Sequence, residues 1–280
     1  MIDTIKSRTV TKRVVVDLSE VMMIVTSNVI SRVAFGKRPY VYDDEGQKEV
    51  KTFHKLLLDS QASFVNFYYR DYFPLMGWLD KLNGTIGRLE KNFNHLDEFY
   101  QELIDEHLNR NRPNKMQDDM VDILLRLKQD SDSNIDLTFD HIKAVLMNIL
   151  FGGTDTSAAT VVWAMTLLIQ NPETLKKVQQ EVRNVIGNKG KVQEDDLQNL
   201  NYLKAFIPFG SGRRGCPGMS LGVATVELTL SNLVYAFDWE LPDGEKDIDT
   251  LATLGIVSHK KNPLRLVAKV YDYGLQELMT

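Results

Sequence analysis

Apolar residues recur at three- and four-residue intervals through most of the first 205 residues, which is the spacing of one face of an α-helix. One such stripe covers residues 21–33 and ends at Gly36, and a second covers residues 89–104. Asp118 and Asp119 precede a third stripe, where their negative charge suits the positive end of a helix. The pattern therefore predicts a mainly α fold.

The longest predicted helix covers residues 142–170, where no proline interrupts the chain, and Thr138 stands in the position of its N-cap. At about 1.5 Å per residue, this helix would measure roughly 43 Å and cross a whole domain. Pro172 marks the start of the next helix and Gly187 its end, because proline suits a first helical turn and glycine a C-terminal cap.

After Phe206 the pattern changes. A glycine-rich loop covers residues 210–218, an apolar helix follows over residues 219–236, and three short strands are predicted at 237–241, 254–258 and 264–270. No linker rich in Gly, Ser or Pro divides the chain. We therefore expect a single domain with a helical part (1–205), a loop with its helix (206–236) and a region of short β-strands (237–280).

Composition narrows the function classes. A formal net charge of −5 argues against a broad phosphate-binding surface, so we expect no nucleic-acid partner. The longest uninterrupted apolar runs are about five residues, far below the roughly 20 that cross a bilayer, so no spanning helix or signal peptide is expected. Cys216 is the single cysteine, which predicts a reducing compartment. The five histidines lack metal-ligand spacing and are expected at the surface or as hydrogen-bonded core groups.

The long helix contains the unusual sequence Gly-Gly-Thr-Asp-Thr-Ser from Gly152 to Ser157. Two glycines within a helix cost roughly 2 kcal/mol relative to alanine, so another interaction must offset them. One interpretation is a kink or a close helix crossing at the small residues. The other is a helix that opens beside a ligand, with Asp155 and Thr156 placed to hold water and pass protons.

The glycine-rich loop places Cys216 just before a helix and close to two arginines, Arg213 and Arg214. Helix N–H groups and cations both favour a thiolate over a thiol, so Cys216 is a candidate ligand or nucleophile. The alternative is a buried cysteine that packs as a small apolar residue.

The same loop also satisfies the dinucleotide pattern G-x-G-x-x-G through Gly210, Gly212 and Gly215. We reject this interpretation because the preceding strand would be about three residues long and contains Pro208, which cannot donate to a central ladder. Alternating β and α elements are also missing from the first 205 residues.

The series Phe209, Gly212, Arg214, Cys216 and Gly218 resembles the haem-binding loop of the cytochrome P-450 family. The segment 152–157 is similar to the oxygen-activating part of that family's long central helix, and the two motifs occur in the family's order. Further similarity at 17–37, 71–80 and 171–205 points to the plant microsomal branch. The resemblance implies a partial cytochrome P-450 fold.

The resemblance implies that Cys216 is the axial thiolate ligand of the iron of haem b, with Arg214 paired to a propionate, Phe209 packed near the sulfur, and Gly212 and Gly218 shaping the loop. It also implies roles on the long helix, where Asp155 and Thr156 would deliver protons and Gly152 and Gly153 would make room for oxygen.

The resemblance further implies a monooxygenase that inserts one oxygen atom from O2 into a small lipophilic substrate. Electrons would come from NADPH through a flavoprotein reductase. In the family this activity resides at the cytosolic face of the endoplasmic reticulum membrane.

The chain departs from the family pattern in two places. No Glu is followed three residues later by Arg, and Ala205 runs directly into Phe206, where the family carries a Glu-x-x-Arg helix and further elements. Met1 aligns inside the family's fold, so we expect the amino-terminal region and its membrane anchor to be missing. Two alternatives to an active enzyme stay open: a non-catalytic truncated product that holds no haem, and a module that pairs with an intact relative.

The aromatic stretch at residues 64–78 has two interpretations. Such a cluster is typical of core packing, which is the first expectation. By the family resemblance it corresponds to the region near the substrate entrance and the membrane surface.

Overall fold

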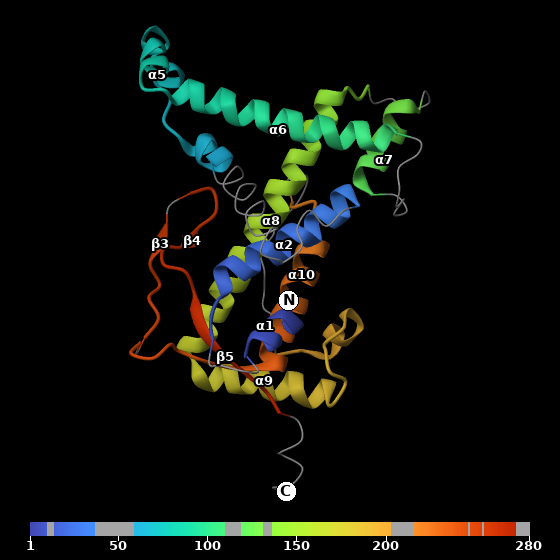
Figure 1. The fold of residues 1–280 in the computed structure, drawn as a ribbon, viewed down its shortest axis with the longest axis vertical. Coiled ribbons are helices and arrows are strands. Elements are labelled where there is room, and N and C mark those ends of the chain that lie inside the picture. The colour runs from blue at the N-terminus through green and yellow to red at the C-terminus, as the bar shows by residue number, and fades with distance from the viewer. Residues whose placement is uncertain are drawn as a thin grey trace, which may run out of the picture. The chain divides into compact units, whose positions relative to one another are not determined.

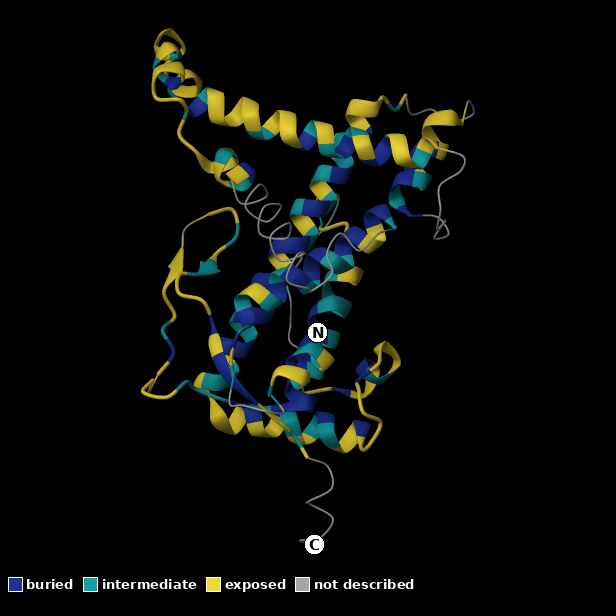
Figure 2. Ribbon diagram, in the orientation of Figure 1, coloured by how far each residue is buried: buried dark blue, intermediate teal, exposed yellow. Residues whose placement is uncertain are grey.

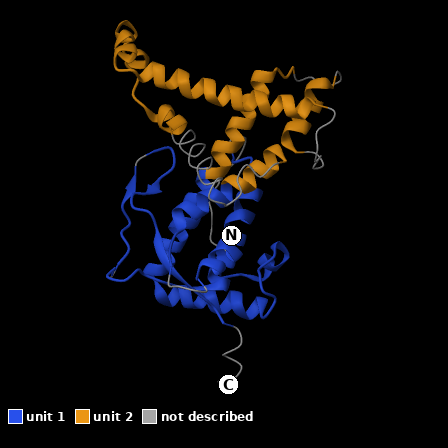
Figure 3. Cartoon of the chain, viewed as in Figure 1, with its two compact units in different colours: residues 1–26, 155–280 blue, residues 27–154 orange. Residues whose placement is uncertain are grey.

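The computed structural model describes residues 1–9, 14–36, 59–109, 119–130, 136–202, 215–245, 247–253 and 255–272. They divide into two compact units, one of Met1–Thr26 with Asp155–Thr280 and the other of Ser27–Thr154 (Figure 3). Each unit contains its own cluster of buried apolar side chains. The single domain of the sequence analysis stays a prediction.

The fold is mainly helical, as predicted (Figure 1). Two helices, α2 and α8, contribute residues to both units. The helical elements are α1 (Ile2–Thr9), α2 (Leu18–Phe35), α4 (Tyr69–Tyr72), η1 (Pro74–Met76), α5 (Trp78–Leu82), α6 (Thr85–Leu108), α7 (Met120–Gln129), α8 (Phe139–Gln170), α9 (Pro172–Ile186), η2 (Glu194–Asn199) and α10 (Met219–Ala236).

Helix ends agree closely with the sequence signals. α2 ends one residue before Gly36, and α9 ends one residue before Gly187; both glycines adopt positive φ, of 64° and 54°. Asp119 caps α7, where its side chain accepts a hydrogen bond from the backbone N–H of Asp122. Thr138 likewise accepts a hydrogen bond from the N–H of His141 at the start of α8.

The strands form two small antiparallel sheets, both in the unit that contains the C-terminus. One has the order β1-β5-β2, with Val16 opposite Leu266 and Trp239 opposite Ala268. The other pairs β3 with β4. The bounds are β1 (Val15–Asp17), β2 (Phe237–Glu240), β3 (Ala252–Thr253), β4 (His259–Lys260) and β5 (Arg265–Val270).

Two of the three predicted strands are confirmed as β2 and β5, whereas the strand predicted at 254–258 is wrong. Residues 255–257 form a bend between β3 and β4, and Leu254 lies outside the described residues. A side chain at Gly255 would come within 3.2 Å of the carbonyl oxygen of Val257, which is the tight backbone approach of a turn. Strand β1 was not predicted.

The expectation that the aromatic stretch at 64–78 packs in a core is wrong for its large side chains. Phe64, Phe67, Tyr72, Phe73 and Trp78 are each exposed by half or more. Figure 2 shows most of the ribbon of α4 and α5 in the colour of exposed residues. Local contacts among them include Phe67 stacked on Tyr72, with ring centroids 5.0 Å apart. The segment therefore presents apolar surface instead of burying it.

By length and composition alone, three described helices are long and apolar enough to cross a membrane: α2, α8 and α10. This result differs from the expectation that no helix could span a membrane. That expectation rested on uninterrupted apolar runs, and polar residues such as Ser and Thr interrupt the apolar residues of each of these helices. About half of the apolar window of each helix is buried within the structure.

Candidate functional site

The two glycines at the middle of α8 have different surroundings. A Cβ placed on Gly153 would lie 2.4 Å from Cδ1 and 2.8 Å from Cγ1 of Ile30, so α2 approaches the helix closely at this point. A Cβ on Gly152 would meet nothing within 4 Å. The close helix crossing proposed from the sequence is therefore present at Gly153, and open space adjoins Gly152.

α8 is helical at every residue of 152–157, so the opening of the helix that one interpretation expected is not found. Thr154 and Asp155 are buried, and the Thr154 hydroxyl has no hydrogen-bond partner among the described residues. Thr156 is exposed, and its carbonyl oxygen accepts a hydrogen bond from the hydroxyl of Thr160. The motif thus places an unpartnered hydroxyl and a carboxylate inside the protein and leaves the second threonine accessible.

The Asp155 carboxylate is paired with His259 of β4, in the same unit. Nε2 of the imidazole lies 2.9 Å from each carboxylate oxygen, and its hydrogen bond is directed at Oδ2, so Oδ1 has no hydrogen bond of its own. The hydrogen bond to Asp155 raises the pKa of His259, although partial burial acts in the opposite direction. The sequence analysis treated His259 as an ordinary surface or core histidine, because 104 residues separate it from Asp155.

Cys216 lies three residues before α10, at the start of a helix as the sequence predicted, and it is exposed. It is therefore not the buried apolar cysteine of the alternative interpretation. A Cβ on Gly218 would come no closer than 3.9 Å to the cysteine Sγ, so the glycine leaves room beside the sulfur. An exposed thiol beside a helix start is a suitable ligand for the iron of a haem.

The structure describes part of the predicted site. Cys216, Asp155 and Thr156 belong to one compact unit, and Gly152 and Gly153 belong to the other. The remaining candidates, Phe209, Gly212 and Arg214, lie outside the described residues. A cavity of about 900 Å³ lined by residues of 59–95 and one of about 400 Å³ lined by residues of 245–265 include none of the predicted site residues.

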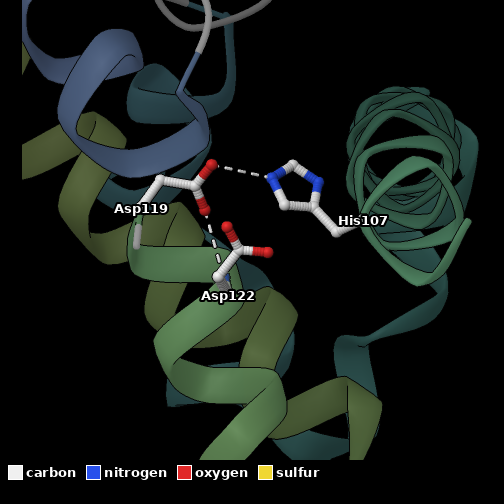
Figure 4. Close-up of side chains that lie close together, drawn as sticks. All are labelled: His107, Asp119 and Asp122. Atoms are coloured by element: carbon white, nitrogen blue, oxygen red, sulfur yellow. Dashed lines mark hydrogen bonds and ion pairs between the residues drawn. The ribbon is translucent and has the colours of Figure 1, made fainter. Parts of the chain in front are cut away.

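A second histidine, His107 of α6, lies with Asp119 and Asp122 at the start of α7 (Figure 4). The side chains of His107 and Asp119 are almost completely buried. Nδ1 of His107 lies 2.6 Å from the carbonyl oxygen of Leu103, and Nε2 lies 3.0 Å from Oδ2 of Asp119. Both ring nitrogens therefore have protein partners, as expected of a hydrogen-bonded core histidine, and the pair connects α6 to α7.

Comparison with known proteins covers nearly the whole chain. The family model of cytochrome P450 matches residues 1–207 and 204–267. A 6,7,8-trihydroxycoumarin synthase of Pastinaca sativa is 37% identical over 88% of this chain and 63% of its own length. Strychnine-11-hydroxylase of Strychnos nux-vomica is 33% identical over 90% of this chain and 65% of its own length.

The fold also resembles that of a cytochrome P450 structure. A crystal structure described as a cytochrome P450DA heme domain superimposes with a TM-score of 0.75, covering 97% of this chain and 72% of that one at 12% identity. At this identity the likeness concerns the fold alone, and it confirms the predicted fold class.

The relatives also locate the departure from the family. The chain spans less than two thirds of the length of the first two relatives, 63% and 64%. About 246 residues, 88% of 280, are spread over 328 aligned positions of the first, so roughly 80 positions have no counterpart in this chain. The two matched segments meet at residues 204–207, where the sequence analysis placed the deletion between Ala205 and Phe206. With a family model matched along nearly its entire length and relatives more than 30% identical, the chain belongs to the cytochrome P450 family.

Proposed function

We propose that the protein is a haem-thiolate monooxygenase that inserts one oxygen atom from O2 into a small lipophilic substrate. One observation carries the proposal: Cys216 stands exposed before α10 in a member of the cytochrome P450 family, within a loop that has the family's spacing of Phe, Gly, Arg, Cys and Gly. Relatives named as a hydroxylase and as synthases of hydroxylated coumarins support the reaction class.

Cys216 is the proposed axial ligand, and its thiolate would hold the iron of haem b. Phe209, Gly212, Arg214 and Gly218 would complete the loop; Arg214 would pair with a propionate through charge-assisted hydrogen bonds. When bound, the haem supplies the oxygen activation, which side chains alone do not perform.

Asp155 and Thr156 are the proposed proton carriers on α8. The buried Asp155 carboxylate has one oxygen without a hydrogen bond among the described residues, and the exposed residue Thr156 follows it in the chain, so together they would connect the interior to solvent. Gly152, next to open space, is the glycine that would leave room for oxygen. At Gly153 the side chain of Ile30 already occupies the position of a Cβ, which supports a packing role.

The proposed redox partner is a flavoprotein reductase that passes electrons from NADPH. We also propose that the protein acts at the cytosolic face of the endoplasmic reticulum membrane, in the manner of the plant microsomal branch. The relatives named for coumarins, xanthotoxin and strychnine make a plant secondary metabolite the proposed substrate class.

The spectrum of the reduced protein with carbon monoxide tests the proposal. The 280-residue chain, reconstituted with haem, should show the red-shifted Soret band of a thiolate-ligated iron, and Cys216→Ser should lose it. Met219→Leu, an exposed change three residues away, should retain the band. A band that persists in Cys216→Ser would reject Cys216 as the ligand. A chain that takes up no haem would favour the non-catalytic truncated product.

A further inference from the structure

Among the described residues, His259 is the basic group that contacts the Asp155 carboxylate. The Asp155 side chain is only 3% exposed, and a carboxylate this deeply buried is stable in its charged form only beside an opposite charge or several donors. Lys260, the next residue on β4, is committed to Asp249, with Nζ 2.8 Å from the carboxylate. His259 is therefore the cation placed to neutralise Asp155.

In the part of the chain that the structure describes, the groups that face His259 come from α8, β3 and its own strand. From α8 the titratable group is Asp155, and from β3 the neighbour is Thr253, whose hydroxyl donates to the His259 carbonyl oxygen and does not titrate. On its own strand the neighbours are Lys260, which is paired with Asp249, and the exposed Lys261 that follows it. The charge state of His259 is thus governed mainly by Asp155.

Two further side-chain hydrogen bonds join α8 to the C-terminal segment among the described residues. The indole Nε1 of Trp163 donates to the Ser258 carbonyl oxygen at 2.8 Å, and the Gln170 side chain donates to the Ile248 carbonyl oxygen at 2.8 Å. Positions 155, 163 and 170 are about two helical turns apart, so they share one face of α8. Of the three attachments, only the one at Asp155 changes with protonation near neutral pH.

We propose that His259 is a positioning residue for Asp155: its protonated imidazole holds the buried carboxylate in place and fastens the β3–β4 hairpin to α8, and its deprotonation weakens both attachments. This role rests on the proposed function of Asp155 as a proton carrier. Because the hydrogen bond is directed at Oδ2, the charged imidazole orients the carboxylate and leaves Oδ1 to accept or give up a proton. Loss of the imidazole proton removes the charge–charge attraction and leaves at most a neutral hydrogen bond to fix this orientation.

Imidazole NMR titration of the 280-residue chain tests the proposal without haem. The His259 signal, identified by its loss in His259→Gln, should titrate above an ordinary histidine in the unmodified protein and fall toward the ordinary value in Asp155→Asn. His141, an exposed histidine at the start of α8, serves as the control, and its signal should not differ between the two proteins. If the His259 signal titrates at the same pH in the unmodified protein and in Asp155→Asn, the proposal is overturned.

The dependence of stability on pH distinguishes a role of His259 that requires its charge from a role in packing alone. A raised folded pKa means that the pair stabilises fully below the pKa of an unfolded histidine and that this contribution is lost as the pH rises through the folded pKa. The difference in melting temperature between the unmodified protein and His259→Gln should therefore be large at about pH 5.5 and small at about pH 8.5. His259→Lys, which stays charged, should keep its stability relative to His259→Gln at both values. An equal difference at the two pH values would reduce His259 to a packing residue.

The haem-loaded protein gives an independent measurement of the same role. With a flavoprotein reductase supplied to pass electrons from NADPH, His259→Gln should raise the peroxide released per NADPH oxidised several-fold, because an Asp155 carboxylate that is not held in place delivers protons less selectively. If the haem spectrum rejects Cys216 while the NMR titration still shows the coupling, the proposed function fails and the ion pair stands. If the haem spectrum supports Cys216 while the NMR titration shows no coupling, only the positioning role of His259 is rejected.

Discussion

At the residue scale, Gly152 and Gly153 show how neighbouring glycines in one motif serve different purposes. Both would cost a helix backbone entropy relative to alanine. Only Gly153 lies where a side chain collides, because Ile30 of α2 fills the space. The sequence indicated that something must offset the two glycines, but it could not assign the helix crossing to one of them, since Ile30 is more than 120 residues away.

Alanine substitutions at the two glycines should change stability in opposite directions. Gly153→Ala should lower the free energy of unfolding by about 1–3 kcal/mol, because the new methyl group overpacks a buried contact. Gly152→Ala should raise it by about 0.5–1 kcal/mol, because it enters open space and removes a helix penalty. Urea unfolding measures both. In an Ile30→Val background the cost of Gly153→Ala should shrink, and an unchanged cost would mean that the collision with Ile30 is not its cause.

At the element scale, the carboxylate of Asp119 takes part both in the cap of α7 and in a contact to α6, beside the apolar packing of the two helices. Oδ1 of Asp119 caps α7 by accepting from the Asp122 N–H at 3.0 Å, and Oδ2 contacts the buried His107 of α6. The sequence predicted the capping role from the position of Asp119 before an apolar stripe. It could not predict the histidine contact, because that depends on how two helices meet.

Asp119→Ala should destabilise the protein by about 2–4 kcal/mol, as the sum of a lost N-cap and a buried imidazole nitrogen, Nε2 of His107, that loses its partner. Glu102→Ala, an exposed change on α6, is the matched control and should stay within about 0.5 kcal/mol. The shift in the urea midpoint measures both variants. A loss of less than about 1 kcal/mol in Asp119→Ala would show that the His107 contact contributes little beyond the cap.

Strands were harder to predict than helices for a physical reason. β5 carries a six-residue pattern that the sequence revealed, whereas β1 is three residues long and is held by pairing with β5 about 250 residues away. The apolar run predicted as a strand at 254–258 lies at a bend, and Ile256 within it is 60% exposed. Helix signals are local, but strand pairing depends on partners that are distant in the sequence.

At the scale of the whole molecule, the motifs identified the family, and the spacing between them located what this chain lacks. The Cys216 loop and the α8 motif keep the family's order, and the family model matches in two segments that meet at residues 204–207. The sequence did not indicate which of its aromatic and apolar residues are buried and which are exposed. An apolar stripe has the same period whether it faces a core or solvent. Residues 64–82 are the clearest case.

This segment carries a large share of exposed apolar surface among the described residues, including Leu75 at 94% and Leu82 at 74% exposure. Exposed apolar side chains of this kind favour association, since covering one leucine contributes about 1.5–3 kcal/mol. We predict that the 280-residue chain self-associates with increasing concentration and that Leu75→Glu with Leu82→Glu weakens this association at least about tenfold.

Light scattering over a concentration series measures the effect, and circular dichroism checks that helix content is unchanged. The matched control is Leu251→Glu, which adds a charge at a leucine that is 56% exposed in the other compact unit. This control should leave the association constant unchanged if residues 64–82 are the contact surface, because its position is far from that segment in the sequence. Equal weakening by the control would show that added negative charge in general, acting on a chain of net charge −5, suppresses association.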